Sequence, residues 1–236
     1  MSRNCICIIC IKPNDIWIDF LSTFKQYDIV FIIDDNSEEY AVKYADKKNI
    51  QCIQIKEEDC SKNGFIDVNA LSFDKITGWE KAVYYFAKVN TTYNQIWFIE
   101  DDVFLHNEET ILNIDKQYPI SDLLTAPYEE KIRNNWHWRS IKIQFPPPYF
   151  HAMVCAVRMS GTLLSTIREY AETHKTLFFL EALFPSLCKA NGLVYDTPTE
   201  MKHIVHMGRY QKENVDVHHL YHPLKDINKH VLFRQK

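Results

Sequence analysis

The sequence predicts an α/β protein in which a mostly parallel central sheet carries helices on both faces. Short, wholly apolar runs that are typical of buried strands recur through the N-terminal half of the chain. Segments with helical periodicity stand between them, and this alternation of strand and helix is characteristic of parallel sheets. The chain has 236 residues, of which 46% are hydrophobic, so it can bury a sizeable core. We expect a single domain over residues 1–236.

The N-terminal half is expected to supply four strands and the helices that connect them. The predicted strands are 5–11, 28–33, 50–55 and 96–99. The predicted helices run from Asn14 or Asp15 to about Tyr27, over 38–49, and from about Thr77 to Val89. The polar stretch 56–77 is expected to be irregular. In the first strand, alternate positions place Cys5 and Cys7 on one face, where they are interpreted as buried thiols.

The C-terminal half has a weaker pattern. A strand is expected over 151–158, a helix from Ser160 to about Thr173, and a second helix over 176–191, ended by Gly192. Residues 128–150 contain three successive prolines and are expected to form a long loop. The tail from Met201 is rich in histidine and shows little periodicity.

Composition excludes several classes of protein. The net charge of -4 and the scattered Lys and Arg residues give no sign of a nucleic-acid or membrane surface. Seven cysteines without a disulfide or zinc spacing favour a reducing compartment. No signal peptide or membrane-spanning run is found, so a cytoplasmic location is expected. Abundant Ile, Lys, Asn, Phe and Tyr suggest an AT-rich genome, viral or protist.

Acidic residues follow two of the predicted parallel strands. Asp34 and Asp35 follow the second strand, and Glu100, Asp101 and Asp102 follow the fourth. Ligands of open α/β sheets bind at the carboxyl ends of the strands, so these side chains should meet at one edge. Crowded carboxylates repel one another unless they are solvated or neutralised by a cation. The spacing therefore favours a site for Mg²⁺ or Mn²⁺ and a diphosphate, although acidic residues also end strands in ordinary solvated turns.

Both acidic segments resemble motifs of one enzyme family. FIIDDNSEE at 31–39 resembles the VDDxS turn of family 2 inverting glycosyltransferases, which have the GT-A fold. IWFIEDDVFL at 96–105 resembles the DXD motif of that fold in its EDD form. The similarity covers residues 4–105 well and 150–195 loosely. It implies that 1–105 binds a UDP-, GDP- or TDP-sugar and that 106–236 binds a saccharide or glycoconjugate acceptor.

The resemblance also implies roles for individual residues. Asp35 would accept a hydrogen bond from the nucleobase, and Asp34 would support that turn. Asp101 would contact the ribose, and Asp102 would bind the Mn²⁺ or Mg²⁺ ion that bridges the phosphates. Lys81 stands where related enzymes often carry a basic nucleotide contact. The EDD form departs from a motif with a free middle position, which leaves Glu100 as a structural residue.

The catalytic base of an inverting transfer has to be chosen on chemical grounds. Such a base is a carboxylate that removes the proton of the acceptor hydroxyl. Glu181 is the best candidate because it stands inside the apolar segment LFFLEALF, where desolvation would raise its pKa. It could equally be a helix-surface residue or pair with Arg158. Asp196 is a weaker alternative.

Histidines and tryptophans supply further candidates. His206 or His219 could add a metal or diphosphate contact, although single histidines more often have structural roles. Trp136 and Trp138 could stack on the apolar face of a sugar, or could form part of a local core.

Three other functions are possible on the same residues. A nucleotidyltransferase would share the fold and the metal, but it usually has a glycine- and arginine-rich phosphate loop after the first strand, and 11–15 (IKPND) lacks one. The other two are a non-catalytic carbohydrate- or nucleotide-binding module and, more distantly, a metallohydrolase.

Overall fold

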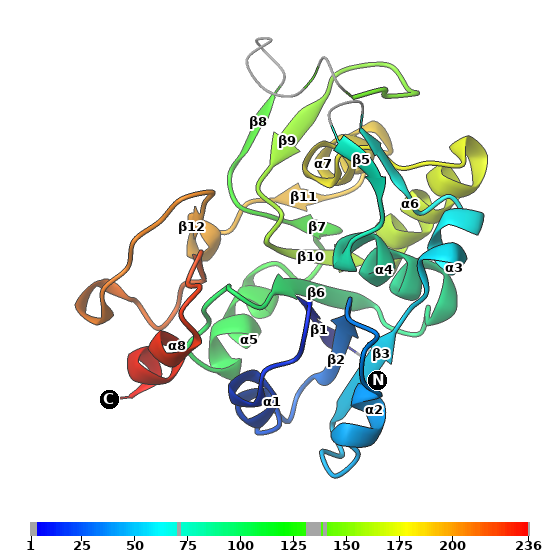
Figure 1. Cartoon of the computed structure of the whole chain (residues 1–236). Helices are drawn as coiled ribbons and strands as arrows, with labels where there is room; N and C mark the ends of the chain where they lie inside the picture. Colours follow the sequence, from blue (N-terminus) through cyan, green and yellow to red (C-terminus); the bar gives the residue numbers. More distant parts are fainter. Residues whose placement is uncertain (1–3, 70–71, 131–137, 139–140, 236) are drawn as a thin grey trace.

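The computed structural model describes residues 4–69, 72–130, 138 and 141–235, and its centre is a seven-stranded sheet (Figure 1). The strand order is β11-β7-β10-β6-β1-β2-β3. The strands β1, β2, β3 and β6 are parallel, β10 runs antiparallel to both β6 and β7, and β11 is parallel to β7. The bounds are β1 Asn4–Cys10, β2 Asp28–Ile33, β3 Ile50–Gln54, β6 Gln95–Glu100, β7 Leu123–Leu124, β10 Ala156–Ser160 and β11 Tyr195–Asp196.

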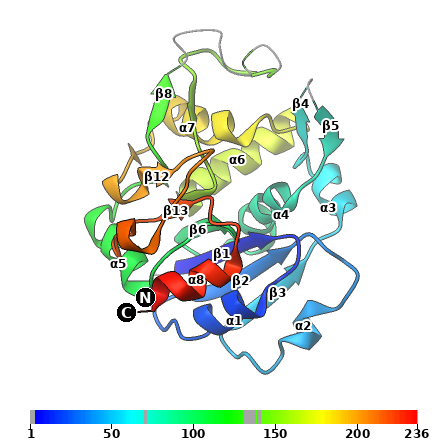
Figure 2. The same cartoon turned by 60° about the vertical axis from the view of Figure 1, so that its left-hand side comes forward.

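Helices cover both faces of this sheet, as the sequence predicts (Figures 1 and 2). One face is covered by α1 (Asp15–Leu21), α2 (Tyr40–Lys43) and α5 (Glu108–Gln117). The other is covered by α3 (Glu57–Lys62), α4 (Gly78–Tyr84), α6 (Gly161–His174) and α7 (Leu180–Ala190). The turn Tyr85–Val89 continues α4 as a π-helix, so the expected helix up to Val89 is confirmed.

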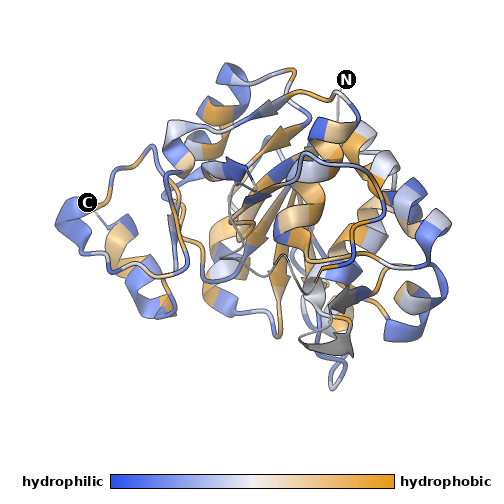
Figure 3. Cartoon of the chain, turned by 90° about the horizontal axis from the view of Figure 1, so that it is seen from above, coloured by the Kyte–Doolittle hydropathy of each residue, from blue (hydrophilic) through white to orange (hydrophobic). Residues whose placement is uncertain are grey.

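Alternation along the strands divides the apolar residues between two cores. Cys5, Cys7 and Ile9 of β1 face the α4, α6 and α7 side, whereas Ile6 and Ile8 face the α1 and α5 side. The predicted common face of Cys5 and Cys7 is confirmed, and both side chains are buried. Hydrophobic residues accordingly gather in the middle of the molecule and hydrophilic ones at its outside (Figure 3).

Two predictions for the N-terminal half were wrong. The expected helix over 38–49 is reduced to the four residues of α2, whose N-cap makes no side-chain hydrogen bond. The stretch 56–77, expected to be irregular, contains α3 and the hairpin of β4 (Asp67–Asn69) and β5 (Ser72–Lys75). Three acidic residues in the first turn of α3 interact favourably with its helix dipole. This local signal for a helix was overlooked because the whole stretch is polar.

In the C-terminal half, tertiary contacts override local pattern. The helix expected over 176–191 begins only at Leu180, because Leu177 instead donates its backbone N–H to Ile66 next to β4 (2.8 Å). The expected strand 151–158 is two strands, β9 (Phe150–Ala152) and β10. β9 pairs with β8 (Tyr128–Glu130), which lies in the expected loop.

The tail from Met201 has more structure than its sequence suggests. It contains β12 (His203–Ile204), β13 (Tyr221–His222) and α8 (Ile227–Arg234), with short 3-10 turns at Thr199–Met201 and Lys212–Asn214. Figure 2 shows α8 beside α1, on the face of the sheet that α1 covers. Among the described residues, no helix is long and apolar enough to cross a membrane.

Candidate functional site

The two acidic segments meet at one edge of the sheet. β1 lies between β2 and β6, and all three strands point the same way. The backbone N–H of Asp34 donates to Cys10 (3.0 Å), and that of Asp101 donates to Ile9 (3.2 Å). Both segments are therefore fixed to the end of β1. We call Asp34 and Asp35 the β2 cluster, and Glu100, Asp101 and Asp102 the β6 cluster.

In the β2 cluster, the charge of Asp34 is neutralised by the buried Lys81. The Lys81 ammonium lies 2.5 Å from Asp34 Oδ1, and the Lys81 side chain is only 1% exposed. Lys81 is held there because α4 begins with a capping box formed by Thr77 and Glu80. The structure therefore shows Lys81 in an ion pair with Asp34. A contact between Lys81 and a nucleotide stays a prediction.

Asp35 organises the turn that follows β2. Its Oδ2 accepts hydrogen bonds from the Ser37 N–H (3.1 Å), the Ser37 hydroxyl (2.6 Å) and the Tyr40 hydroxyl (2.8 Å). The two hydroxyl donors contribute most to lowering the pKa of Asp35. Its Oδ1 lies 3.8 Å from the Lys12 ammonium. One carboxylate oxygen is thus committed to the turn, and the other is the one that could meet a ligand.

The backbone of the β6 cluster is held by residues distant in sequence. The Trp17 indole N–H donates to the Asp101 carbonyl (2.7 Å), and the Leu224 N–H donates to the Asp102 carbonyl (2.7 Å). The Trp79 indole N–H donates to Glu100 Oε1 (2.6 Å). Helix α1, helix α4 and the C-terminal tail therefore all converge on this one loop.

The carboxylates of the β6 cluster are poorly compensated. Asp101 has an exposed surface, but partial desolvation and the charges of Asp102 and Glu100 raise its pKa to about 6. Oδ1 of Asp102 is buried and has no hydrogen-bond partner among the described residues. A buried carboxylate oxygen without a donor is costly, and a bound cation would relieve that cost.

A histidine from the tail faces these carboxylates. His222 Nε2 lies 3.3 Å from Asp102 Oδ1 and 3.7 Å from Glu100 Oε2, although its alignment with Oδ1 falls short of a hydrogen bond. The other ring nitrogen, Nδ1, lies 2.7 Å from the Val205 carbonyl, which assigns the proton of the neutral ring to Nδ1. Burial lowers the pKa of His222, but the Asp102 carboxylate, the Val205 carbonyl and the Glu100 charge outweigh it, and the pKa is raised.

This arrangement fits a divalent cation. In the neutral ring, the Nε2 lone pair points toward carboxylate oxygens, so either a proton or a metal ion must lie between them. The Cys155 sulfur is within 4.8 Å of the ligand atoms of Glu100 and His222, but burial raises the pKa of this thiol and keeps it protonated. Glu100, Asp102 and His222 are therefore the candidate ligands that the geometry offers: Glu100 and His222 belong to one group of possible metal ligands, and Asp102 Oδ1 lies 3.3 Å from His222 Nε2.

Among the histidines of the tail, the structure places His222 against the β6 cluster, and the metal contact predicted for His206 stays a prediction. His206 is exposed in the segment after β12, and His219 contacts the His203 ring at 5.5 Å between centroids. His222 belongs to the same histidine-rich tail, and the bridge between Tyr221 and Phe104, with the hydrogen bond from Leu224 to the Asp102 carbonyl, brings it to the acidic edge. No local pattern distinguishes His222 from the other two, which is why sequence reasoning missed it.

Glu181 lies in the first turn of α7 and lines a cavity of about 230 Å³, which we call the Glu181 pocket. Burial, followed by the charge of Glu100, raises the pKa of Glu181 to about 7. Glu100 also lines this pocket, so one residue borders both the pocket and the cation site. The lining residues are Asp67, Thr77, Trp79, Glu80, Glu100, Val154, Cys155, Phe179, Leu180 and Glu181.

The other candidates lie elsewhere. Asp196 of β11, the alternative base, accepts a hydrogen bond from the Ser121 hydroxyl (2.5 Å) and does not line the Glu181 pocket. Trp138 is 6% exposed and packs near Tyr149 and His151, which favours its interpretation as part of a local core. Trp136 lies outside the described residues.

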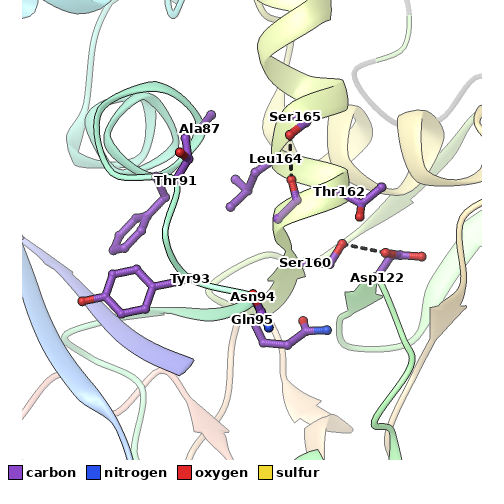
Figure 4. A pocket seen from close by; sticks show the side chains of 12 residues that line it. Ala87, Thr91, Tyr93, Asn94, Gln95, Asp122, Ser160, Thr162, Leu164 and Ser165 are labelled. Carbon is purple, nitrogen blue, oxygen red and sulfur yellow. Dashed lines mark hydrogen bonds between the residues drawn. The ribbon is translucent and has the colours of Figure 1, made fainter. Parts of the chain in front are cut away.

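A larger cavity of about 590 Å³ opens at the opposite end of β6 (Figure 4). It is lined by Gln95, where β6 begins, and by Ser160 and Asp122, which are joined by a hydrogen bond of 2.6 Å. Both acidic clusters follow the carboxyl ends of their strands, so this cavity lies away from them.

Comparisons with known proteins define the fold class. An active-site mutant of LgtC superposes with a TM-score of 0.53 at 11% identity, covering 98% of this chain and 94% of that one. The 4-diphosphocytidyl-2C-methyl-D-erythritol synthase of Anaerococcus prevotii gives 0.52 at 10% identity, covering 100% and 96%. No protein-family model and no curated protein sequence matches the chain. The molecule therefore has an α/β fold of the GT-A type, and at this level of identity the comparisons establish the fold alone.

Proposed function

We propose that this chain is a metal-dependent glycosyltransferase that moves a sugar, with inversion, from a nucleoside diphosphate sugar to an acceptor hydroxyl. One observation carries the proposal: the Glu181 carboxyl lines a pocket that shares Glu100 with the candidate cation site. A base and a diphosphate site on adjoining sides of one residue are the two parts that such a transfer requires.

The proposed reaction uses these residues in named roles. Asp35 hydrogen-bonds the nucleobase, the Asp34–Lys81 pair stiffens its turn, and Asp101 contacts the ribose. Asp102 and His222 would hold a divalent ion, which would supply positive charge for the diphosphate leaving group. An imidazole ligand beside a carboxylate favours Mn²⁺ over Mg²⁺.

Glu181 performs the proton transfer in this scheme. Its ionised carboxylate takes the acceptor hydroxyl proton, the acceptor oxygen forms a bond to the anomeric carbon of the donor, and the bond from that carbon to the diphosphate oxygen breaks. The diphosphate leaves with the bonding electrons. A pKa of about 7 suits this role, because such a carboxylate is both ionised in part and basic enough at neutral pH.

A nucleotidyltransferase is the second candidate, since a putative glucose-1-phosphate thymidylyltransferase from Bacillus anthracis has a similar fold, with a TM-score of 0.50 at 11% identity. Residues 11–14 (IKPN), between β1 and α1, contain no glycine or arginine to cradle a triphosphate. That chemistry also has no need of a carboxyl base in a separate pocket. The position of Glu181 therefore favours sugar transfer.

Glu181→Gln tests the proposal directly. The first step is to find the donor by thermal shift with UDP-, GDP-, TDP- and CMP-sugars, with and without Mn²⁺. The variant should bind the donor normally while transfer falls by about 10²–10⁴-fold, because shape is kept and the proton acceptor is lost. The wild-type rate should rise with pH through about 7, as Glu181 ionises, and this limb should vanish in the variant.

Glu169→Gln on α6 is the matched control, because Glu169 is not fully buried and does not line the pocket. It should transfer sugar at the wild-type rate. Transfer by Glu181→Gln at a similar rate would show that Glu181 is structural and would remove the main support for the proposal.

A further inference from the structure

Asp67 has no part in the reaction above, yet it lines the Glu181 pocket. It begins β4, pairs with Lys75 of β5, and forms a bridge to Leu177, shortly before α7. The adjacent residue Ile66 accepts hydrogen bonds from the Leu177 N–H (2.8 Å) and the Thr176 hydroxyl (3.1 Å). The hairpin and the segment before α7 are thereby tied together, and β5 is drawn beside α7 in Figure 1. The carboxyl groups of Asp67 and Glu181 line one cavity from these two elements.

One oxygen of the Asp67 carboxyl, the buried Oδ1, lacks a donor among the residues that the structure describes. Burial, followed by the charge of Glu80, raises the pKa of Asp67 to about 7. A structural carboxyl normally has donors around it, whereas a buried one that faces a cavity without them is suited to a donor on a ligand.

The rest of the pocket limits what that ligand can be. Its volume of about 230 Å³ equals that of roughly seven water molecules in the liquid, which suits one small polar ring. Trp79 offers a partly exposed indole at the wall, held in place by stacking on Phe98. A flat apolar surface beside two hydrogen-bond acceptors matches a ring that has C–H groups on its face and hydroxyls at its edge.

We infer that Asp67 accepts a hydrogen bond from a second hydroxyl of the acceptor, next to the hydroxyl that Glu181 deprotonates. The acceptor is therefore a polyol ring, a saccharide, and not an isolated hydroxyl such as that of a serine side chain or a simple alcohol. This inference rests on the proposed function for the identity of the ligand as acceptor. It makes Asp67 a specificity-determining residue.

Saturation-transfer NMR with methyl hexosides of the gluco, galacto and manno series tests this, with UDP and Mg²⁺ present. The wild type should bind at least one hexoside, and Asp67→Asn should weaken that binding by about tenfold or more, because a charge-assisted hydrogen bond is lost. Asp67→Ser, which shortens the side chain, should do the same. Asp59→Asn, an exposed site on α3, should bind as the wild type does.

The inference is overturned if the wild-type protein binds none of the hexosides, or if Asp67 variants that remain folded by circular dichroism bind them with unchanged affinity. With 1-propanol as a probe carrying a single hydroxyl, a response equal to that of the hexosides would also overturn it. Donor binding is scored separately, with the UDP-sugar and Mn²⁺. If the wild type binds the UDP-sugar but none of the hexosides, the role of Asp67 is rejected, whereas if it binds a hexoside but no donor, the proposed transferase is rejected.

Discussion

The β2 and β6 clusters look alike in sequence, since each is an acidic run at the end of a buried parallel strand, but the protein treats them differently. In the β2 cluster, Asp34 lies 2.5 Å from Lys81, and Asp35 accepts three hydrogen bonds through Oδ2. In the β6 cluster, the pKa of Asp101 is raised to about 6 and Asp102 keeps a buried oxygen without a donor among the described residues.

This is the difference that we expect between a turn that is complete by itself and the proposed cation site. The β2 cluster carries its own counter-charge and donors, so it is complete in the free protein and presents a fixed surface. The β6 cluster has its backbone fixed from three directions, while among the described residues its three carboxylates share one partial counter-charge, that of His222, and pair with no Lys or Arg. Rigid placement of uncompensated charge is the expected property of a cation site.

The largest effect should come from removing one carboxylate charge from each cluster. Asp102→Asn should weaken Mn²⁺-dependent binding of UDP by at least about a hundredfold, because it removes a proposed metal ligand. Asp34→Asn should keep that binding and lose stability instead, since it strands the buried Lys81 charge. Isothermal titration calorimetry and urea unfolding measure the two effects. Equal loss of metal-dependent binding in both variants would erase the distinction between the clusters.

The second prediction concerns the counter-charge of the β2 cluster. Lys81→Met should cost about 3 kcal/mol in the free energy of unfolding at pH 7, because Asp34 then lacks its partner. Lys88→Met is the control: its pair with Glu172 is as short, 2.6 Å, but exposed, so less than about 1 kcal/mol should be lost. A similar loss in both variants would show that the Asp34–Lys81 pair has no special role.

Sequence reasoning was most successful where the structure is local. The strand 28–33 was located as observed, and both acidic runs were assigned to the correct sheet edge. Buried strands and their ends can be recognised from the pattern of a few consecutive residues. His222, Trp79 and Asp67 were missed. His222 lies in β13, Trp79 in α4 and Asp67 in β4, and each comes to the site through contacts with residues distant in sequence. A single sequence does not display such contacts.

The third prediction is a gain of stability from the proposed base. Above pH 7 the folded protein must hold an ionised Glu181 against its pKa of about 7, compared with 4.5 for an ordinary glutamate. Because this pKa is raised on folding, the cost is absent below about pH 4.5 and complete above about pH 7, where it is on the order of 3 kcal/mol. Glu181→Gln should therefore stabilise the protein at pH 8 and have little effect at pH 4.5.

Urea unfolding at the two pH values measures this, with Glu169→Gln as the control that should change neither. If the difference in unfolding free energy between Glu181→Gln and the wild type is the same at both pH values, Glu181 titrates normally. The prediction extends the comparison of the two clusters, since the charge of Glu100 is one cause of the raised pKa. Mn²⁺ and UDP should reduce the difference at pH 8, because a bound cation offsets that charge.

The smallest effect concerns the turn that Asp35 organises after β2. If Asp35 Oδ1 accepts a hydrogen bond from a base N–H, uracil, thymine and guanine should be preferred to cytosine, which lacks an imide proton. Asp35→Ala should then weaken UDP binding by about tenfold, the lower end of the range for a charge-assisted hydrogen bond, and leave CDP binding nearly unchanged.

Loss of the turn itself has to be separated from loss of the base contact. Tyr40→Phe removes one of the three donors to Asp35 Oδ2 and keeps the carboxylate, so it should loosen the turn without changing the preference for UDP over CDP. If Tyr40→Phe abolished that preference as fully as Asp35→Ala, the turn and not the carboxylate would be responsible. If neither changed it, the nucleobase would be recognised elsewhere, and Asp35 would be a residue of the fold in the same sense as the Asp34–Lys81 pair beside it.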